Sequence, residues 1–154
     1  MKRLLLIVLP LLLIVGCSKE PINYETTLVE RESVFYTQDT NEPYSGPVFS
    51  LYEDEKKKEE GTYKDGKPDG LWTYWYNDGQ KKGELTFKDG KLHGTQINWY
   101  RNGQKEYEWN YKDGERDGLI TSWDDNGQKR FEGTYKDGKE ISSKQWNEKG
   151  YPIY

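Results

Sequence analysis

The chain of 154 residues contains no alanine, one cysteine and one histidine. Because Cys17 is the sole cysteine, no intramolecular disulfide can form. One cysteine and one histidine are too few ligands for a zinc site, and no second histidine or further cysteine is present to build a Cys–His nucleophilic site. His93 occupies a position that holds Asp69 and Asp117 elsewhere in the chain, so we interpret it as a turn residue rather than a catalytic base. We therefore expect no cofactor, no metal and no enzymatic activity.

Basic and aliphatic residues are also scarce. The chain has 23 Lys and Arg against 27 Asp and Glu, for a net charge of −4. A nucleic-acid partner needs a basic stripe or patch, so none is expected. Aromatic residues are plentiful, with 6 Trp, 13 Tyr and 4 Phe. This composition disfavours an aliphatic two-layer core and favours a single twisted sheet with an aromatic side.

The longest apolar run is short and lies at the N-terminus. Lys2 and Arg3 precede the run from Leu4 to Val15, which matches a secretory signal and is too short to span a bilayer as a mature helix. The run ends in "IVGCS", which resembles the lipobox of bacterial lipoproteins, whose cysteine is lipidated and becomes the first mature residue. Residues 1–16 are thus predicted to be a lipoprotein signal peptide; a simple signal peptide or an uncleaved anchor remains the alternative.

The lipobox predicts lipidation at Cys17 and a membrane contact through that lipid. Residues 17–27 are polar and are predicted to form a tether. The residue after the cysteine is Ser18 rather than Asp, which is the kind of residue that sorting to the outer membrane tolerates. We therefore expect a lipid-anchored protein of the bacterial cell envelope, at the outer membrane or the cell surface.

The rest of the chain repeats with a period of 24 residues. The stretch "GTYKDGK" occurs twice, three periods apart, and a second turn recurs as "NDGQK", "RNGQK" and "DNGQK". Repeats of this length indicate stacked units, none of which can bury its apolar side alone. The expected turn residues are Gly79, Gly103 and Gly127 in the second turn, and the pairs Asp65 and Gly66, Asp89 and Gly90, Asp113 and Gly114, and Asp137 and Gly138 in the first.

Each unit is predicted to be a β-hairpin. Runs such as "LWTYWY" and "KEYEWNYK" are rich in aromatic and β-branched residues, and Asn, Asp and Gly supply the turns between them. The segment "LVERESVFYTQ" is predicted to be a leading strand. At the other end "SSKQWNEKGYPIY" repeats half a unit, with Trp146 in the tryptophan position and Gly150 in the turn.

Odd-numbered positions carry most of the bulky side chains, and alternation along a strand places them on one face. A three-residue loop with a type I turn and a glycine bulge would keep odd positions of both strands on that face. The predicted aromatic binding face consists of Trp75, Trp99, Trp123, Trp146, Phe87, Trp109 and Tyr111.

The units "DGKPDGLWTYWYNDGQKKGELTFK", "DGKLHGTQINWYRNGQKEYEWNYK" and "DGERDGLITSWDDNGQKRFEGTYK" resemble the bacterial variant of the MORN (membrane occupation and recognition nexus) repeat. The resemblance implies an all-β, single-layer antiparallel sheet of stacked hairpins over residues 28–154, used as a scaffold without catalytic residues. Some bacterial members are labelled antitoxins of toxin–antitoxin systems, which fits poorly with an exported chain.

The sequence leaves several functions open. The first is a scaffold that binds a protein partner, with an antitoxin-like inhibitor as one variant. The second is binding of a glycan or cell-wall polysaccharide to the aromatic face. The third is that the aromatic side chains only pack against one another, as cross-strand pairs do.

Overall fold

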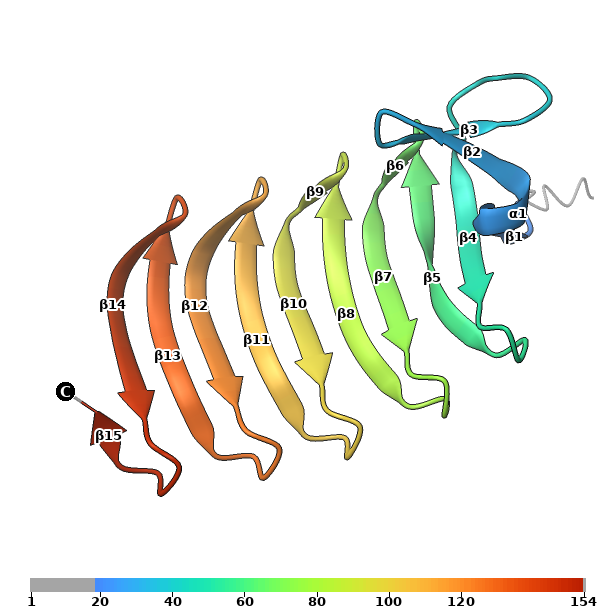
Figure 1. Cartoon of the computed structure of the whole chain (residues 1–154). Helices are drawn as coiled ribbons and strands as arrows, with labels where there is room; N and C mark the ends of the chain where they lie inside the picture. The colour runs from blue at the N-terminus through green and yellow to red at the C-terminus, as the bar shows by residue number, and fades with distance from the viewer. Residues whose placement is uncertain (1–18, 154) are drawn as a thin grey trace, which may run out of the picture.

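The computed structural model describes residues 19–153, so Cys17 and the predicted signal peptide lie outside it. It is an elongated sheet in which consecutive hairpins lie side by side (Figure 1). This confirms the all-β sheet of stacked hairpins. The sheet has 13 strands, in the order β1-β4-β5-β7-β8-β10-β11-β12-β13-β14-β15, with β6 beside β5 and β9 beside β8.

The strands of the repeat region alternate in direction, and each begins and ends next to a turn. They are β4 (Gly46–Leu51), β5 (Lys57–Lys64), β6 (Lys67–Pro68), β7 (Gly70–Trp75), β8 (Lys81–Lys88), β9 (Lys91–Leu92), β10 (Gly94–Trp99), β11 (Lys105–Lys112), β12 (Glu115–Trp123), β13 (Lys129–Lys136), β14 (Lys139–Trp146) and β15 (Pro152–Ile153). Among the described residues, no helix combines the length and the apolar character that crossing a bilayer requires.

Two kinds of turn close the hairpins. At one end of the strands, Asp65 and Gly66 both have positive φ, 50° and 74°, as a two-residue type I′ turn demands. At the other end the Tyr76 amide donates to the Gln80 carbonyl at 2.8 Å, and the Gly79 amide donates to the Tyr76 carbonyl at 2.9 Å. This second loop is a type I turn closed by a glycine with φ of 86°.

A β-bulge beside the second turn decides which side chains share a face. Tyr74 pairs with Gly83, whereas Trp75 pairs with Lys81, so Lys82 is an extra residue on β8. The same register shift recurs in the hairpins β4–β5, β10–β11 and β12–β13. The turn itself keeps odd residues opposite odd residues, but the bulge then reverses that match along the rest of the hairpin.

The prediction of a single aromatic face is therefore wrong. Even positions of the first strand of each hairpin share a face with odd positions of the second, as the pair Trp72 and Leu85 shows. We call this the capped face, and it includes Phe87, Trp109 and Tyr111. The opposite face, which we call the ladder face, carries Trp75, Trp99, Trp123 and Trp146.

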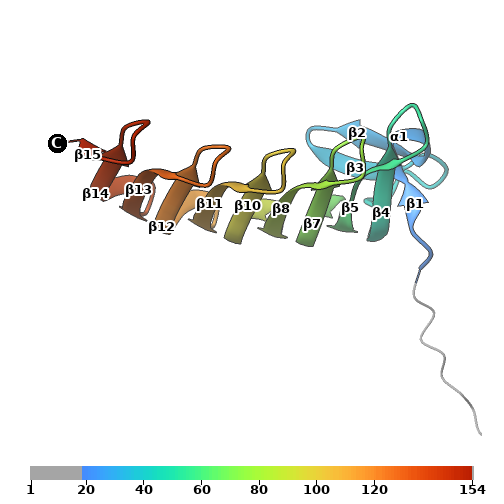
Figure 2. The same cartoon turned by 90° about the horizontal axis from the view of Figure 1, so that it is seen from below.

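The N-terminal segment folds into a cap at one end of the sheet (Figure 2). Its elements are β1 (Ile22–Asn23), α1 (Tyr24–Thr27), β2 (Leu28–Arg31) and β3 (Val34–Thr37). The single leading strand predicted here is wrong, because Glu32 and Ser33, with φ of 50° and 63°, turn the chain back and make a separate two-stranded sheet. The predicted tether is corrected as well: β1 pairs in parallel with β4.

The cap covers the N-terminal part of the capped face and forms the main core. Leu28, Tyr44, Val48, Tyr63 and Trp72 are buried there. The Trp72 indole lies directly on the backbone of Gly61, where a Cβ atom would come within 2.3 Å of the ring. Only glycine leaves room for this contact, so Trp72 can lie flat across β5 and reach the cap.

A buried carboxylate joins the cap to the sheet. The Glu59 side chain is 8% exposed. It accepts hydrogen bonds from the Tyr24 hydroxyl at 2.5 Å and the Ser50 hydroxyl at 2.9 Å. Beside it, the ring centroids of Phe35 and Tyr63 stack 4.6 Å apart. Because a buried acceptor is costly when unpaired, the hydrogen bond from Tyr24 favours the docked cap, while Ser50 supplies a donor from the sheet itself.

Candidate functional site on the capped face

The tryptophans of the ladder face pack against lysines of the preceding unit. The ammonium of Lys57 lies 5.4 Å from the Trp75 ring centroid, and Lys81 lies 5.6 Å from that of Trp99. The same contact recurs at 5.9 Å over Trp123 and at 5.5 Å over Trp146. All four rings are half-buried. Each lysine also pairs with the glutamate three residues further on.

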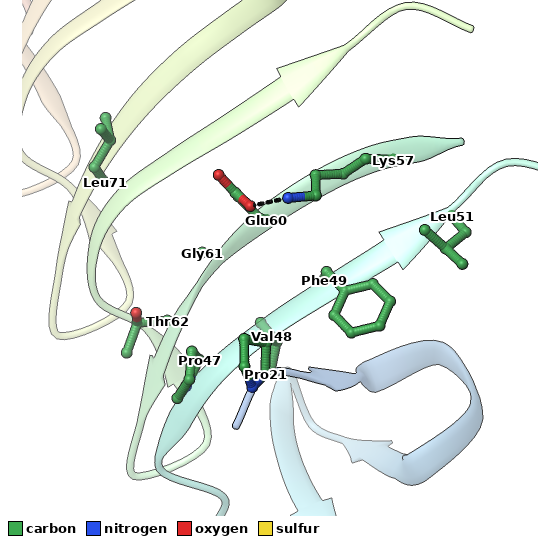
Figure 3. A pocket seen from close by; sticks show the side chains of 10 residues that line it. All are labelled: Pro21, Pro47, Val48, Phe49, Leu51, Lys57, Glu60, Gly61, Thr62 and Leu71. Carbon is green, nitrogen blue, oxygen red and sulfur yellow. Dashed lines mark hydrogen bonds and ion pairs between the residues drawn. The ribbon is translucent and has the colours of Figure 1, made fainter. Parts of the chain in front are cut away.

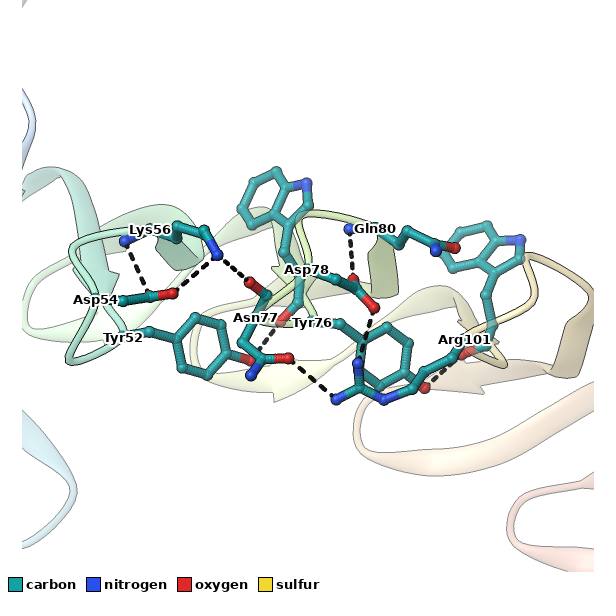
Figure 4. Close-up of polar contacts among 10 residues, drawn as sticks. Tyr52, Asp54, Lys56, Tyr76, Asn77, Asp78, Gln80 and Arg101 are labelled. Carbon is teal, nitrogen blue, oxygen red and sulfur yellow. Dashed lines mark hydrogen bonds and ion pairs between the residues drawn. The ribbon is translucent and has the colours of Figure 1, made fainter.

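A column of tyrosines, which the sequence interpretation did not single out, links each unit to the next. The hydroxyls of Tyr52 and Tyr76 donate to the backbone carbonyls of the tryptophans 23 residues ahead, at 2.6 and 2.8 Å (Figure 4). Tyr100 makes the same contact with Trp123 at 2.9 Å. The 24-residue spacing of these tyrosines is the sequence signal that marks the column. The column ends at Asp124, whose carboxylate instead pairs with Arg130 at 2.9 Å.

Side chains at the Asn-Gly turns add polar contacts between units. The Arg101 guanidinium donates to Asp78 at 2.8 Å and to Asn77 at 3.2 Å, and Lys56 donates to the Asn77 carbonyl at 3.0 Å (Figure 4). Each exposed pair contributes little alone, at most about 1 kcal/mol. Their repetition nevertheless shows that the ladder face and its adjoining turns hold the stack together.

A second aromatic group lies on the capped face, in the C-terminal half of the sheet. The rings of Tyr107 and Trp109 stack with centroids 4.4 Å apart and planes inclined by 28°. Tyr111 lies next to Trp109 at 6.5 Å. The Arg116 guanidinium lies 4.5 Å from the Trp109 centroid and 5.6 Å from that of Tyr135. These five residues, all half-buried, form what we call the platform.

The central residues of the platform, Trp109 and Arg116, differ from the ladder in not being repeated, whereas Tyr111 and Tyr135 occupy one repeat column with Tyr63 and Phe87. The position of Trp109 is occupied by Gly61, Leu85 and Gly133 in the other units, and that of Arg116 by Pro68, Leu92 and Glu140. Residues needed for stacking are expected to recur along the repeat, as the ladder tryptophans and turn glycines do in the units that follow the first. A side chain found in a single unit is not required by the repeat, so the platform is the candidate functional site.

Hydrogen bonds fix the edges of the platform. Gln96, opposite Trp109 on β10, donates to the Tyr107 hydroxyl at 3.0 Å, and burial raises the pKa of Tyr107. The Tyr135 hydroxyl donates to Glu140 at 2.8 Å, and Glu140 also accepts from the Ser143 hydroxyl at 2.6 Å. These contacts hold the phenols in place.

An open hollow of about 550 Å³ lies on the other side of the sheet, over β4, β5 and β7 (Figure 3). Its lining is mainly apolar, with Phe49, Leu51 and Leu71, and the Lys57–Glu60 ion pair lies at its rim. Residues 19–153 hold no cluster of three or more side chains arranged to bind a metal ion.

Fold and site together define a repeat protein whose units form one extended β-sheet. Three segments, residues 68–89, 92–113 and 116–137, match the family model of the MORN repeat variant. A comparison with the curated proteins found no match to this chain. Repeats of the MORN family are generally non-enzymatic and suggest a scaffold for binding.

Proposed function

We propose that this protein is a non-catalytic scaffold that binds a partner protein through the platform while a lipid on Cys17 holds it at the bacterial cell envelope. The observation that carries the binding proposal is the contrast between the repeated ladder and the unrepeated pair of Trp109 and Arg116 at the centre of the platform. Buried aromatic and arginine side chains are the commonest anchors at protein interfaces. The platform combines both types on the part of the capped face that the cap leaves uncovered.

The ladder face is poorly suited to the alternative function, glycan binding. Stacking of a sugar needs a free aromatic ring face, but a lysine lies over each ladder tryptophan. On the platform, Tyr107 and Trp109 stack on each other and Arg116 covers Trp109. A protein surface, which can contact ring edges, hydroxyls and a guanidinium, suits this arrangement better than a glycan does.

Site-specific photo-crosslinking in the native cell tests the proposal. Ser122 and Leu119 lie on the same strand, β12, but on opposite faces: Ser122 pairs with Tyr107 on the capped face, and Leu119 with Thr134 on the ladder face. A photoreactive residue at Ser122 should yield a defined adduct with another protein, which Trp109→Ala should abolish, whereas Leu119 should yield none. Adducts from Leu119 alone, or from neither position, would disprove the platform as the binding site.

The anchor is tested separately. A palmitate analogue should label the wild-type chain, and Cys17→Ser should lose both the label and membrane association. Fractionation of the envelope then tests the expected outer-membrane location. Continued membrane association of Cys17→Ser, with no labelling of the wild type, would disprove lipidation and leave the platform proposal standing.

A further inference from the structure

We propose that the platform recognises a carboxylate, and that its ligand is a peptide segment in which an Asp or Glu side chain lies next to an apolar or aromatic one. The carboxylate binds Arg116, and the neighbouring side chain contacts Tyr107 and Tyr111. This inference rests on the proposed function, because it names the chemistry of the partner at the same site.

Among the arginines of residues 19–153, Arg116 and Arg31 form no ion pair, and of these two only Arg116 lies on the repeat sheet. Arg101 pairs with Asp78, Arg130 pairs with Asp124, and Arg31 donates to Asn41. Arg116 forms no ion pair with any acidic side chain in this part of the chain, and its contacts are with aromatic rings. Its positive charge therefore has no direct ion-pair partner among these residues, and Glu140 is linked to it only through the Tyr135 ring and hydroxyl.

The stacking of Arg116 prepares it for a carboxylate. A guanidinium is planar, and a ring that covers one of its faces leaves the N–H groups at its edge free to donate. Two of these donors match the two oxygens of a carboxylate, which makes a charge-assisted, bidentate pair. Trp109 and Tyr135 also limit the orientations of the side chain, so less conformational entropy is lost when the ligand binds.

The protein itself shows that a peptide can cover this face. The cap lies over the first half of the capped face, where Tyr24 packs edge-on against Trp72 with centroids 6.4 Å apart. In that half the sheet contributes the carboxylate acceptor, Glu59, and the cap contributes the donor, the Tyr24 hydroxyl. At the platform the sheet supplies the donor, so charge complementarity calls for an acidic ligand rather than a second cap-like segment.

A phage-displayed library of random dodecapeptides, selected on the full chain, tests the inference. Peptides retained by the wild type should be enriched in Asp or Glu beside an aromatic or apolar residue. Arg116→Glu should retain peptides enriched instead in Lys or Arg. Arg101→Glu, which makes the same change of charge on the turn side of the molecule, should select the same acidic peptides as the wild type.

Affinities of a selected peptide, measured by fluorescence anisotropy, separate the inference from the proposed function. Arg116→Ala should weaken binding at least tenfold, and Arg116→Lys should restore only part of the loss. If Trp109→Ala abolishes binding but the Arg116 variants bind like the wild type, the platform stands and carboxylate recognition is wrong. If no peptide is retained, or if neither residue matters, both proposals are wrong. Melting curves confirm that each variant is folded.

Discussion

At the scale of single residues, backbone conformation places the turns. Gly79 and Gly103 have φ of 86° and 83°, and a Cβ atom added at either position would meet nothing within 4 Å. Steric contact with other residues therefore plays no part in the requirement for glycine. The left-handed backbone alone demands it, because a Cβ atom clashes with its own carbonyl there.

Gly103→Val should therefore destabilise the protein through φ alone. A β-branched residue tolerates the left-handed region poorly, so we expect the free energy of unfolding to fall by more than about 1 kcal/mol. Gly103→Asn should cost less, because Asn visits this region more readily. Urea unfolding of both variants measures the difference, and equal stabilities of Gly103→Val and the wild type would contradict the turn assignment.

Glu55 offers the reverse experiment. It occupies the turn position of Gly79 in the preceding unit, with φ of 64°, and its amide donates to the Tyr52 carbonyl at 2.9 Å. Glu55→Gly should relieve the strain and raise the free energy of unfolding by about 1 kcal/mol. Glu53→Gly, in the same loop but with no positive φ, serves as the control and should not stabilise the protein.

At the scale of elements, the buried tyrosines where the cap meets the sheet make the stability of the fold depend on pH. Burial, followed by the effect of the Glu59 carboxylate, raises the pKa of Tyr74 to about 12. Burial also raises the pKa of Tyr24 and of Tyr63. Each phenol therefore holds its proton more tightly in the folded state than in the unfolded state, where its pKa is about 10.

The sign of the linkage follows from this difference. The stability that these protonated phenols contribute is complete below about pH 10 and is lost as the pH rises above the unfolded pKa. We expect the melting temperature to fall steeply above pH 10. Tyr74→Phe removes one ionisable group and should flatten that fall. Equal slopes for the variant and the wild type in melting curves from pH 8 to 11.5 would contradict the prediction.

The two aromatic groups should respond in opposite ways to truncation. Trp99→Ala removes a half-buried ring that Lys81 covers, so we expect a loss of about 2 kcal/mol of stability and no change in peptide affinity among folded molecules. Trp109→Ala should reduce binding far more. Urea unfolding and anisotropy measurements on both variants distinguish a role in stacking from a role in binding. A binding defect confined to Trp99→Ala would show that the ladder face, not the platform, is the binding site.

At the scale of the whole molecule, the 24-residue period makes units removable. Deleting residues 94–117 joins His93 to Gly118, which occupies the same position in the next unit as Gly94. Ser122 would then lie opposite Gly83, where Asn98 pairs now. Because stacked repeats interact only with their neighbours, the shortened chain should fold with a lower melting temperature. It loses Tyr107, Trp109, Tyr111 and Arg116, so it should not bind the selected peptides.

Deleting 23 residues instead, 94–116, provides the matched control. This deletion shifts every later strand by one residue relative to the preceding unit. Side chains that belong on the ladder face would then point to the capped face, and the reverse. We expect this chain to misfold over its C-terminal half, seen as a loss of β-sheet circular dichroism. If both deletions fold equally well, the register of the repeat does not determine the packing between units.

Local signals made the hairpins predictable. The 24-residue period, the Asp-Gly pairs and the Asn-Gly turns are visible in the sequence, because turn conformation depends on a few adjacent residues and glycine alone satisfies positive φ without strain. The stacking of units follows from the same repetition. The sequence by itself therefore determines the all-β architecture, the order of the hairpins and the position of each turn within the repeats.

The faces and the site were decided by tertiary structure. Whether Trp75 and Phe87 point the same way depends on the bulge at Lys82, and "QKKGE" contains no residue that demands one. The cap depends on contacts across 35 residues, such as Tyr24 with Glu59, which no local pattern records. Arg116 meets Trp109 and Tyr135 only through the register and the bulges of the neighbouring strands β11, β12 and β13, because pairing geometry rather than sequence spacing sets which side chains meet.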